Sequence, residues 1–257
     1  MESSEQYYSR TWETASQAYG ELGFYKWCIE RIPNGTHILE IGTGIGIATL
    51  ALLEAAFIVS SLEENLYNFE KAKKRLSDSG KNVNFLPSIK TARQYFGENN
   101  LIKSNFIIDW GEVVNTIKYD TVICWFVGVH QTAHENHDMI KLGYNKRDFG
   151  HYRELIYDRI FQVISLKLPV GGVISLVERV GALTSEQMAE EIKLFDNDYD
   201  LGAYGLKIEK IEQLAIGDMS LLPGIKMVAV KGGALPIEEE KREAILISYT
   251  IIKYRVI

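Results

Sequence analysis

The sequence predicts an α/β protein in which a mostly parallel sheet carries helices on both faces. Two observations support this prediction. Short apolar runs typical of buried strands alternate along the chain with segments whose apolar residues repeat at helical spacing. In addition, the stretch ILEIGTGIGIATLALLE, residues 38–54, places a glycine-rich turn between such a strand and such a helix.

Composition narrows the class of protein. The chain has 257 residues, enough for one large domain, and is 46% hydrophobic and 24% charged, as is typical of globular proteins. Its formal net charge of −6 argues against a general nucleic-acid binder, which normally has a basic face. The N-terminus lacks the apolar core of a signal peptide, and no apolar run approaches the roughly 18 residues that span a membrane. We therefore expect a cytoplasmic protein that binds neither nucleic acid nor a membrane.

The N-terminal part of the chain is expected to be helical. Residues 1–36 carry aromatic side chains at helical spacing, which predicts one or two amphipathic helices that form a cap. A turn at 33–35 (PNG) then leads to a buried strand at 36–41 (THILEI). The glycine-rich turn follows, and residues 45–56 are predicted to form a helix.

The next segment should supply a second strand and its helix. Residues 57–65 (FIVSSLEEN) are predicted to form the strand and residues 65–79 the helix, with basic side chains outside its apolar stripe. Residues 81–104 suggest a small strand (VNFL) and a helix (IKTARQYFG). A further strand is predicted at 104–111 (SNFIIDWG), ending at Asp109.

The C-terminal half continues the alternation. A strand is predicted at 119–129 (YDTVICWFVGV), a long helix over 152–167 and a strand at 169–179 (PVGGVISLVER). Residues 206–216 (LKIEKIEQLAI) and 225–233 (IKMVAVKGG) resemble a closing antiparallel pair. No internal repeat or low-complexity linker interrupts the chain, so a single domain is predicted.

The glycine-rich turn favours some nucleotides over others. Its pattern is G-x-G-x-G, whereas the fingerprint of dinucleotide-binding folds is G-x-G-x-x-G, and Ile47 stands at the last position of that fingerprint. Glu40 directly precedes the turn. A helix N-terminus attracts phosphate, but a carboxylate beside it repels phosphate and suits a cationic group.

Two further acids are predicted to reach the same edge of the sheet. Glu63, or its neighbour Glu64, ends the second strand, where an acid can accept hydrogen bonds from ribose hydroxyls. Asp109 ends the next predicted strand, and Trp110 beside it offers a flat face for a base. Carboxylates at successive strand ends describe a site for a positively charged nucleoside.

Four motifs, LEIGTGIG, LEEN, FIIDWGE and YDTVICWFVGVH, follow one another in this order, and this set resembles the class I S-adenosylmethionine-dependent methyltransferases. The resemblance covers about residues 36 to 180 and, more loosely, the final hairpin. It implies a Rossmann-like fold with a mostly parallel, seven-stranded sheet and a helical N-terminal cap. It also implies S-adenosylmethionine as the cofactor and S-adenosylhomocysteine as its product.

By this resemblance, successive strand ends would hold successive parts of the cofactor. The methionine part would contact Glu40, Gly42, Gly44 and Gly46. The ribose would contact Glu63, with Glu64 as the alternative if the strand ends one residue later. The adenine amine would be held by Asp109 and its ring by Trp110. The cofactor and the substrate would both be lined by Trp125 and Phe126.

The spacing departs from the family in one respect, because the interval between Glu63 and Asp109 is longer than usual. Either an insertion at about 81–104 accounts for the interval, or Ser88 occupies the adenine position and Asp109 has another role. We favour the insertion. The single domain 1–257 then divides into a cap at 1–36, a catalytic core at 37–235 and a C-terminal tail at 236–257.

Methyl transfer to an amine nitrogen is the predicted reaction, on a small molecule or a modified peptide. His130 follows the fourth strand and is a candidate substrate contact or proton acceptor. Glu178, Asp158 and Tyr8 would steer and orient a protonated amine before it loses its proton. A looser resemblance, in size and in the aromatic cap with its "YDR" helix, is to the N-methyltransferases that act on azole-containing peptides.

Metal binding is not expected. His130, His134 and His137 are spaced i, i+4, i+7 and would share one face of a helix, and with Glu135 and Asp138 nearby they could form a metal site, but we favour their interpretation as polar surface. Cys28 and Cys124 fit no metal-ligand spacing and are expected to be buried free thiols.

Three alternative functions stay open at this point. The first is a small-molecule O-methyltransferase, which would need a base or a metal to deprotonate the hydroxyl. The second is a nicotinamide-dependent oxidoreductase on the same sheet and turn, which Ile47 and Glu40 disfavour. The third is a nucleoside-binding protein without catalytic activity.

Overall fold

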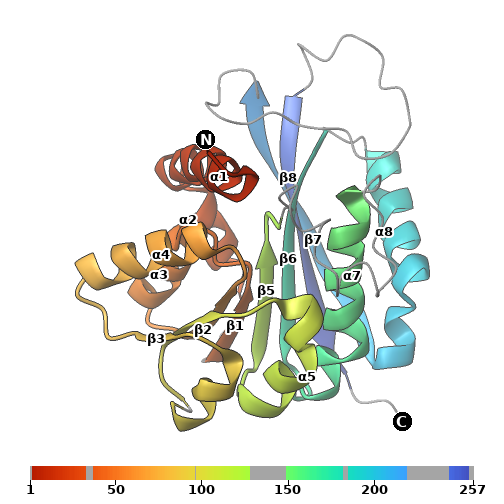
Figure 1. Ribbon diagram of the computed structural model, residues 1–257. Coiled ribbons are helices and arrows are strands. Elements are labelled where there is room, and N and C mark those ends of the chain that lie inside the picture. Colours follow the sequence, from red (N-terminus) through yellow and green to blue (C-terminus); the bar gives the residue numbers. More distant parts are fainter. Residues whose placement is uncertain are drawn as a thin grey trace.

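The computed structural model describes residues 2–32, 37–95, 97–127, 149–181, 185–218 and 243–254. Over these ranges the chain forms a central sheet with helices on both faces (Figure 1). The strands are β1 (His37–Ile41), β2 (Ile58–Glu63), β3 (Asn84–Leu86), β4 (Asn100–Lys103), β5 (Thr121–Trp125), β6 (Val173–Gly181), β7 (Leu206–Asp218) and β8 (Glu243–Lys253). The α-helices are α1 (Ser4–Glu21), α2 (Phe24–Ile29), α3 (Ile47–Glu54), α4 (Leu66–Asp78), α5 (Phe106–Thr116), α7 (Phe149–Gln162) and α8 (Ser185–Tyr199).

The strand order within the described sheet is β3-β4-β2-β1-β5-β6-β8-β7. Neighbouring strands from β3 to β6 pair in parallel, whereas β8 pairs antiparallel with both β6 and β7. This arrangement confirms the predicted α/β class. The order reverses between β1 and β5, and ligands of open α/β sheets bind outside the carboxyl ends of the strands at such a point. The glycine-rich turn after β1 lies there.

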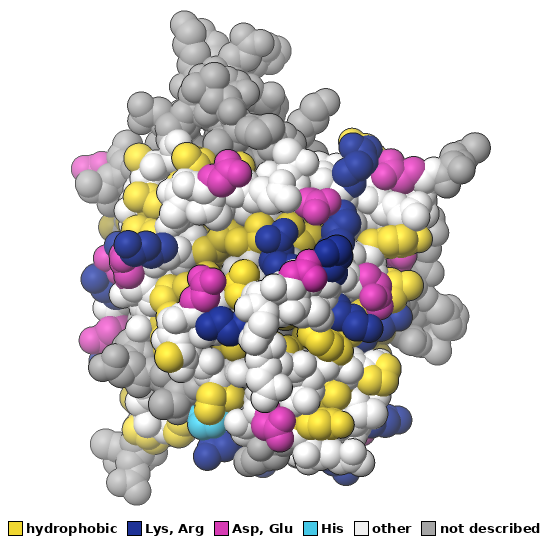
Figure 2. All heavy atoms as spheres, turned by 90° about the vertical axis from the view of Figure 1, so that its left-hand side faces the viewer, with side chains coloured by type: hydrophobic (Ala, Val, Ile, Leu, Met, Phe, Trp, Pro, Cys, Tyr) yellow, Lys and Arg dark blue, Asp and Glu magenta, His cyan; other side chains and the backbone are white. Residues whose placement is uncertain are grey.

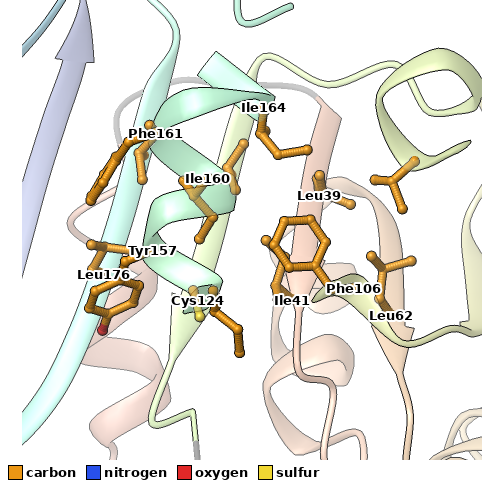
Figure 3. Packing of buried hydrophobic residues seen from close by; sticks show 14 of the residues in the cluster. Leu39, Ile41, Leu62, Phe106, Cys124, Tyr157, Ile160, Phe161, Ile164 and Leu176 are labelled. Carbon is orange, nitrogen blue, oxygen red and sulfur yellow. The ribbon is translucent and has the colours of Figure 1, made fainter. Parts of the chain in front are cut away.

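Two hydrophobic clusters cover the two faces of the sheet. Because successive side chains of a strand point to opposite faces, Ile38 packs into one cluster and Leu39 into the other. The first cluster receives α1 to α4 through side chains that include Tyr19 and Leu52. The second receives α5, α7 and α8, and Figure 3 shows how Phe106 and Ile160 meet the strands there.

Most predicted elements are present, and capping explains where α4 begins. The side chain of Asn65 accepts hydrogen bonds from the backbone N–H groups of Tyr67 and Asn68, at 2.9 and 3.1 Å. It therefore ends the second strand segment and starts the helix. The two cap helices, the first two strands and the helices that follow each of them are confirmed, as are the predictions corresponding to β3, β5, α7, β6 and β7.

The predicted strand at 104–111 is wrong, because this segment begins the helix α5. The side chain of Asn105 accepts from the N–H groups of Ile107 and Ile108, which is the geometry of a helix N-cap. The strand in this part of the sheet is β4, directly before it. Asp109 consequently lies in the first turn of a helix and not at a strand end.

The closing pair also differs from the prediction. The partner of β7 is β8, which lies in the segment predicted as a C-terminal tail and is inserted between β6 and β7. The sequence alternates so that Ile245, Ile247 and Ile251 join one cluster while Leu246 joins the other, as a strand buried on both faces requires. The turn at 33–35 and the segment 225–233 lie outside the described residues.

The described sheet has eight strands where seven were expected, since β3 adds a short edge strand from the predicted insertion. The helix α8 was not predicted. No helix in the described ranges combines the length and the apolar character needed to cross a bilayer. The face in Figure 2 carries acidic and basic side chains in alternation, with hydrophobic ones scattered between them.

Candidate functional site

The glycine-rich turn is bound to the end of β2. The N–H groups of Gly42 and Thr43 both donate to the carbonyl of Leu62, at 3.0 Å each. The N–H of Gly44 donates to Oε2 of Glu63 at 2.7 Å. Gly44 has a φ of 58°, in the left-handed region that favours glycine. The turn therefore presents its backbone to the carboxylate that ends β2.

Glu63 is the last residue of β2, where the sequence placed it, and its side chain is buried. Its Oε1 accepts from the N–H of Asn65 at 2.8 Å, while Oε2 accepts from Gly44. Burial raises the pKa of this carboxyl to about 8, against the smaller opposing effect of its backbone hydrogen bonds. The proton equilibrium of Glu63 therefore falls near neutral pH.

Glu64 connects three separate segments of the chain. Its Oε1 accepts from the hydroxyl of Tyr152 on α7 at 2.5 Å, and its Oε2 accepts from the amide of Asn105 at 2.6 Å. Burial raises the pKa of Glu64, and the hydrogen bond from Tyr152 opposes this rise. The side chain is a junction between the ends of β2 and β4 and the helix α7.

These groups line a pocket at the carboxyl edge of the sheet. The strand ends and the adjoining turns contribute Gly42, Gly44, Glu63, Glu64, Ser104 and Phe126. The helices contribute Tyr8, Trp12, Asn68, Phe106, Tyr152 and Ile156. The pocket encloses about 60 Å³, whereas small-molecule sites typically measure roughly 300–1,000 Å³. A nucleoside needs more room than this closed form offers.

The helix α1 closes the pocket. A Cβ added to Gly44 would lie 2.3 Å from the indole Nε1 of Trp12, so the indole rests directly on the turn. Glu13 of α1 forms an ion pair with Lys71 of α4 at 2.7 Å. Figure 1 shows α1 next to α2 and α4, on the same face of the sheet. The predicted cap is thus a cover over the site.

Tyr8 of α1 also lines the pocket, beside two carboxylates. Burial raises the pKa of Tyr8, and the charges of Glu63 and Glu64 raise it further. Its hydroxyl therefore stays protonated at neutral pH. Of the four side chains predicted to contact the substrate, Tyr8 is the one that the described structure brings to this pocket.

Two predicted cofactor residues lie beside the pocket without lining it. The carboxylate of Glu40 accepts from the hydroxyls of Thr49 and Ser61 at 2.6 and 2.5 Å, and burial raises its pKa. Gly46 allows a close approach of two helices, since a Cβ there would lie 3.0 Å from the backbone of Ala72 on α4. Glu40 therefore links β1 to β2 and α3, and Gly46 lets the start of α3 approach α4.

The expected adenine residues are displaced by the helix α5. Asp109 accepts from the hydroxyl of Ser104 at 2.7 Å and from the N–H of Asn105 at 3.1 Å, which closes the turn between β4 and α5. The ring of Trp110 lies under the guanidinium of Arg159, 5.5 Å from its carbon to the ring centroid. Neither residue lines the pocket, because the strand ends at Lys103 and the pocket wall there is Ser104 and Phe106. Ser88, the alternative, precedes a 3₁₀ helix and does not line the pocket either.

The two aromatic residues at the end of β5 take different positions. Trp125 is a core residue whose indole N–H donates to the hydroxyl of Ser175 at 3.1 Å. Phe126 lines the pocket and packs on Tyr19, with ring centroids 4.9 Å apart. Its φ of 55° is unusual for a residue other than glycine, and such strain often occurs at functional sites.

The remaining substrate candidates do not meet at the pocket. Glu178 accepts from Arg153 at 2.9 Å and from the hydroxyl of Tyr157 at 2.6 Å, so it holds α7 against β6. Asp158 also belongs to α7, and its charge acts on Tyr199 of α8. His130, like His134 and His137, lies outside the described residues. Within the described ranges, no cluster of three or more His, Cys, Asp or Glu side chains is arranged to hold a metal ion.

Several pocket residues were missed from the sequence. Trp12 was recognised only as part of an aromatic cap, and Ser104, Asn68 and Tyr152 gave no signal of their own. Asn68 follows a capping residue on a helix, and Tyr152 lies 88 positions from its partner Glu64. Only tertiary structure brings them together.

Comparison with protein-family models and with curated proteins finds no match. Among solved structures, SMU.776, assigned as a methyltransferase and complexed with S-adenosylhomocysteine, matches with a TM-score of 0.52 and 11% identity, over 89% of this chain and 48% of that one. TrmN from Thermus thermophilus matches with a TM-score of 0.47 and 10% identity, over 89% and 48%. The [4+2]-cyclase SpnF matches with 0.48 and 12%, over 90% and 80%. The chain spans about half the length of SMU.776 and of TrmN, and the similarity to SMU.776 shows that its fold is class I methyltransferase-like.

Proposed function

We propose that this chain is an S-adenosylmethionine-dependent methyltransferase that methylates an amine nitrogen of a small molecule or modified peptide. The observation that carries the proposal is the contact between Glu63 and Gly44. It places a buried carboxylate against a glycine turn at the strand-order reversal of a methyltransferase-like fold. A cationic nucleoside with hydroxyl donors fits such a site.

The hydrogen-bonding groups of the pocket distinguish between a nicotinamide dinucleotide and S-adenosylmethionine as its ligand. A dinucleotide needs free N–H groups for its pyrophosphate, but those of Gly42, Thr43 and Gly44 already bind Leu62 and Glu63. When it is ionised, the Glu63 carboxylate would also repel the phosphates. Ribose hydroxyls and a sulfonium carry the donors and the charge that carboxylates prefer. The residues present therefore fit S-adenosylmethionine better than a nicotinamide dinucleotide.

The cofactor supplies an activated methyl group, and the chain must supply the positioning. Glu63 would accept from a ribose hydroxyl, and Gly42 and Gly44 would lie under the methionine part. Trp12 and Phe126 would exclude water from the two ends of the site. Holding the reacting atoms in line can contribute roughly 7–11 kcal/mol, so no covalent nucleophile is required of the protein.

The acidic, phenol-lined surroundings favour an amine as the acceptor. The hydroxyl of Tyr8, beside Glu63 and Glu64, is placed to accept an N–H of an incoming ammonium. His130 is proposed as a substrate contact or proton acceptor. For Glu178 and Asp158 we propose only that they attract a protonated amine toward the site. The charge of Glu178 is already matched by Arg153.

Calorimetry tests the cofactor. The protein should bind S-adenosylhomocysteine and give no heat with NAD, and the reverse pattern would contradict the proposal.

A second experiment tests the acceptor: cell extract is incubated with methyl-labelled S-adenosylmethionine, and the product is identified by mass spectrometry. A labelled amine supports N-methylation and should form faster as pH rises. A labelled ether or ester, or activity lost to a chelator and restored by magnesium, would establish O-methylation instead. Binding without turnover would leave a nucleoside-binding protein.

A further inference from the structure

One polar side chain in the pocket is buried and incompletely satisfied. Asn68 of α4 is 3% exposed and lines the pocket beside Glu63. Its Oδ1 has no hydrogen-bond partner within the part of the chain that the structure describes. Buried side-chain oxygens are nearly always paired, so an exception calls for an explanation.

The orientation of the Asn68 amide follows from its neighbour. The side chain of Asn68 donates a hydrogen bond to the carboxylate of Glu63, which lowers the pKa of Glu63 against the effect of burial. A carboxylate only accepts, so the amide nitrogen must face Glu63. The amide oxygen then points away from Glu63 and keeps its lone pairs available.

Packing alone does not account for an asparagine at this position. The buried stripe of α4 otherwise consists of Phe69, Ala72 and Leu76. The helix is already capped by Asn65, so Asn68 has no capping role. An apolar side chain at position 68 would avoid the cost of an unpaired oxygen. The structure retains a free acceptor at the wall of the pocket.

We propose that Asn68 is a binding residue that accepts a hydrogen bond from one of the two ribose hydroxyls of the nucleoside, while Glu63 accepts from the other. Two neighbouring hydroxyl donors need two acceptors that lie side by side. The carboxylate of Glu63 and the amide oxygen of Asn68 are such a pair at the pocket wall. Asn68 therefore determines specificity for a vicinal diol over a deoxyribose. The inference rests on the proposed function, since it takes the nucleoside to be that of S-adenosylmethionine.

The test combines ligand and protein changes. Calorimetry measures binding of S-adenosylhomocysteine and of its 2′-deoxy and 3′-deoxy analogues to the wild-type protein, Asn68→Leu and Asn68→Ala. We expect each variant to bind S-adenosylhomocysteine about 5- to 20-fold more weakly, as for one buried hydrogen bond. For one of the two deoxy analogues, the variants and the wild type should bind equally. Asn115→Leu on α5, an exposed helical asparagine, is the matched control and should change none of the affinities.

The outcomes separate the inference from the proposed function. Equal losses for all three ligands would mean that Asn68 only positions Glu63, and unchanged affinities would mean that water alone satisfies its oxygen; either result overturns the inference. No binding of S-adenosylhomocysteine to the wild type would overturn the proposed function with it. If a variant does not fold, the wild type still decides, because equal affinity for all three ligands contradicts the inference.

Discussion

Strands β2 and β6 each carry a glutamate, Glu63 at the end of β2 and Glu178 within β6, and the sequence assigned both to one crevice, yet their surroundings differ. Glu63 at the end of β2 accepts hydrogen bonds from the neutral N–H groups of Gly44 and Asn65. Glu178 in β6 accepts from the guanidinium of Arg153 and from the hydroxyl of Tyr157. Glu63 lines the pocket, whereas Glu178 binds the helix α7 to β6.

The difference indicates how an acid that is available to a ligand can be told from a structural one. A buried carboxylate held only by neutral donors is costly to ionise, and the pKa of Glu63 is accordingly raised to about 8. A carboxylate with a guanidinium partner has its charge compensated within the protein. Glu63 can therefore gain from donors that a ligand brings, whereas Glu178 already has its partners.

The largest expected effect is on cofactor affinity at the end of β2. Glu63→Ala should weaken binding of S-adenosylhomocysteine by about 1–3 kcal/mol, because one ribose hydroxyl is left without its buried acceptor. Calorimetry measures this difference. Glu112→Ala removes an exposed acid of α5 that pairs with Arg93, and it should leave the affinity unchanged. Equal affinities for wild type and Glu63→Ala would remove the distinction between Glu63 and Glu178.

The position of Glu63 could be predicted because its signals are local. An apolar run ends at Leu62, and Asn65 begins a helix, which leaves the acid at the strand end. Asp109 was misplaced because the apolar run around it satisfies a strand pattern and a helix pattern equally well. The N-cap at Asn105 was the available signal for the helix. Contacts such as that between Glu64 and Tyr152 depend on the packing of distant segments and cannot be predicted from a local pattern.

The next prediction concerns pH. In the folded protein the pKa of Glu63 is raised from 4.5 to about 8, so the folded state binds the proton more tightly. The stabilising contribution of protonated Glu63 is therefore complete below about pH 4.5 and is lost as pH rises through about 8. Relative to Glu63→Gln, the free energy of unfolding of the wild type should fall by at most about 1.4 kcal/mol per pH unit in this window. Denaturant titrations between pH 5 and 9 measure this difference. If the assignment is incorrect, the free energies of unfolding of the wild type and of Glu63→Gln would change with pH in the same way.

A smaller effect is expected at Glu178 in β6, and on stability instead of affinity. Arg153→Met should lower the free energy of unfolding by about 1–2 kcal/mol, because Glu178 loses its cationic partner. The loss is moderate since the side chain of Arg153 is 35% exposed and water screens the pair. Urea unfolding measures the stability, and calorimetry should give an unchanged affinity for S-adenosylhomocysteine. A large loss of affinity would mean that Glu178 belongs to the same site as Glu63.

The strand β8 shows why part of the fold was missed. Its residues are as apolar as those of β6, but two apolar runs, at 225–233 and 243–253, follow β7 and compete as its partner. Pairing between strands depends on register and on burial by both neighbours, which a single run does not encode. Apart from β4, the parallel strands were predictable because their apolar runs alternate with helical segments.

The smallest expected effect concerns the cover over the β2 site. We expect a ligand larger than the present cavity to displace α1, which lines the pocket through Tyr8 and Trp12 and is held to α4 by the ion pair of Glu13 with Lys71. Each of these side chains is 34% exposed, so the pair should contribute only about 0.3–0.8 kcal/mol. Glu13→Gln weakens the closed form with and without ligand. Association and dissociation of S-adenosylhomocysteine should therefore both become about 2-fold faster while the dissociation constant hardly changes.

Stopped-flow binding at two ionic strengths checks this expectation. Added salt should raise the association and dissociation rates of the wild type, because it screens the ion pair, and should leave those of Glu13→Gln nearly unchanged. Lys71→Gln should reproduce the rates of Glu13→Gln, and the double variant should add nothing, since all three remove the same pair. Lys74→Gln breaks a second ion pair of α4, with Asp78, that does not involve α1, and should leave both rates unchanged. If the rates respond equally to Lys74 and to Lys71, the general charge of α4 steers the ligand and α1 is not the barrier to entry.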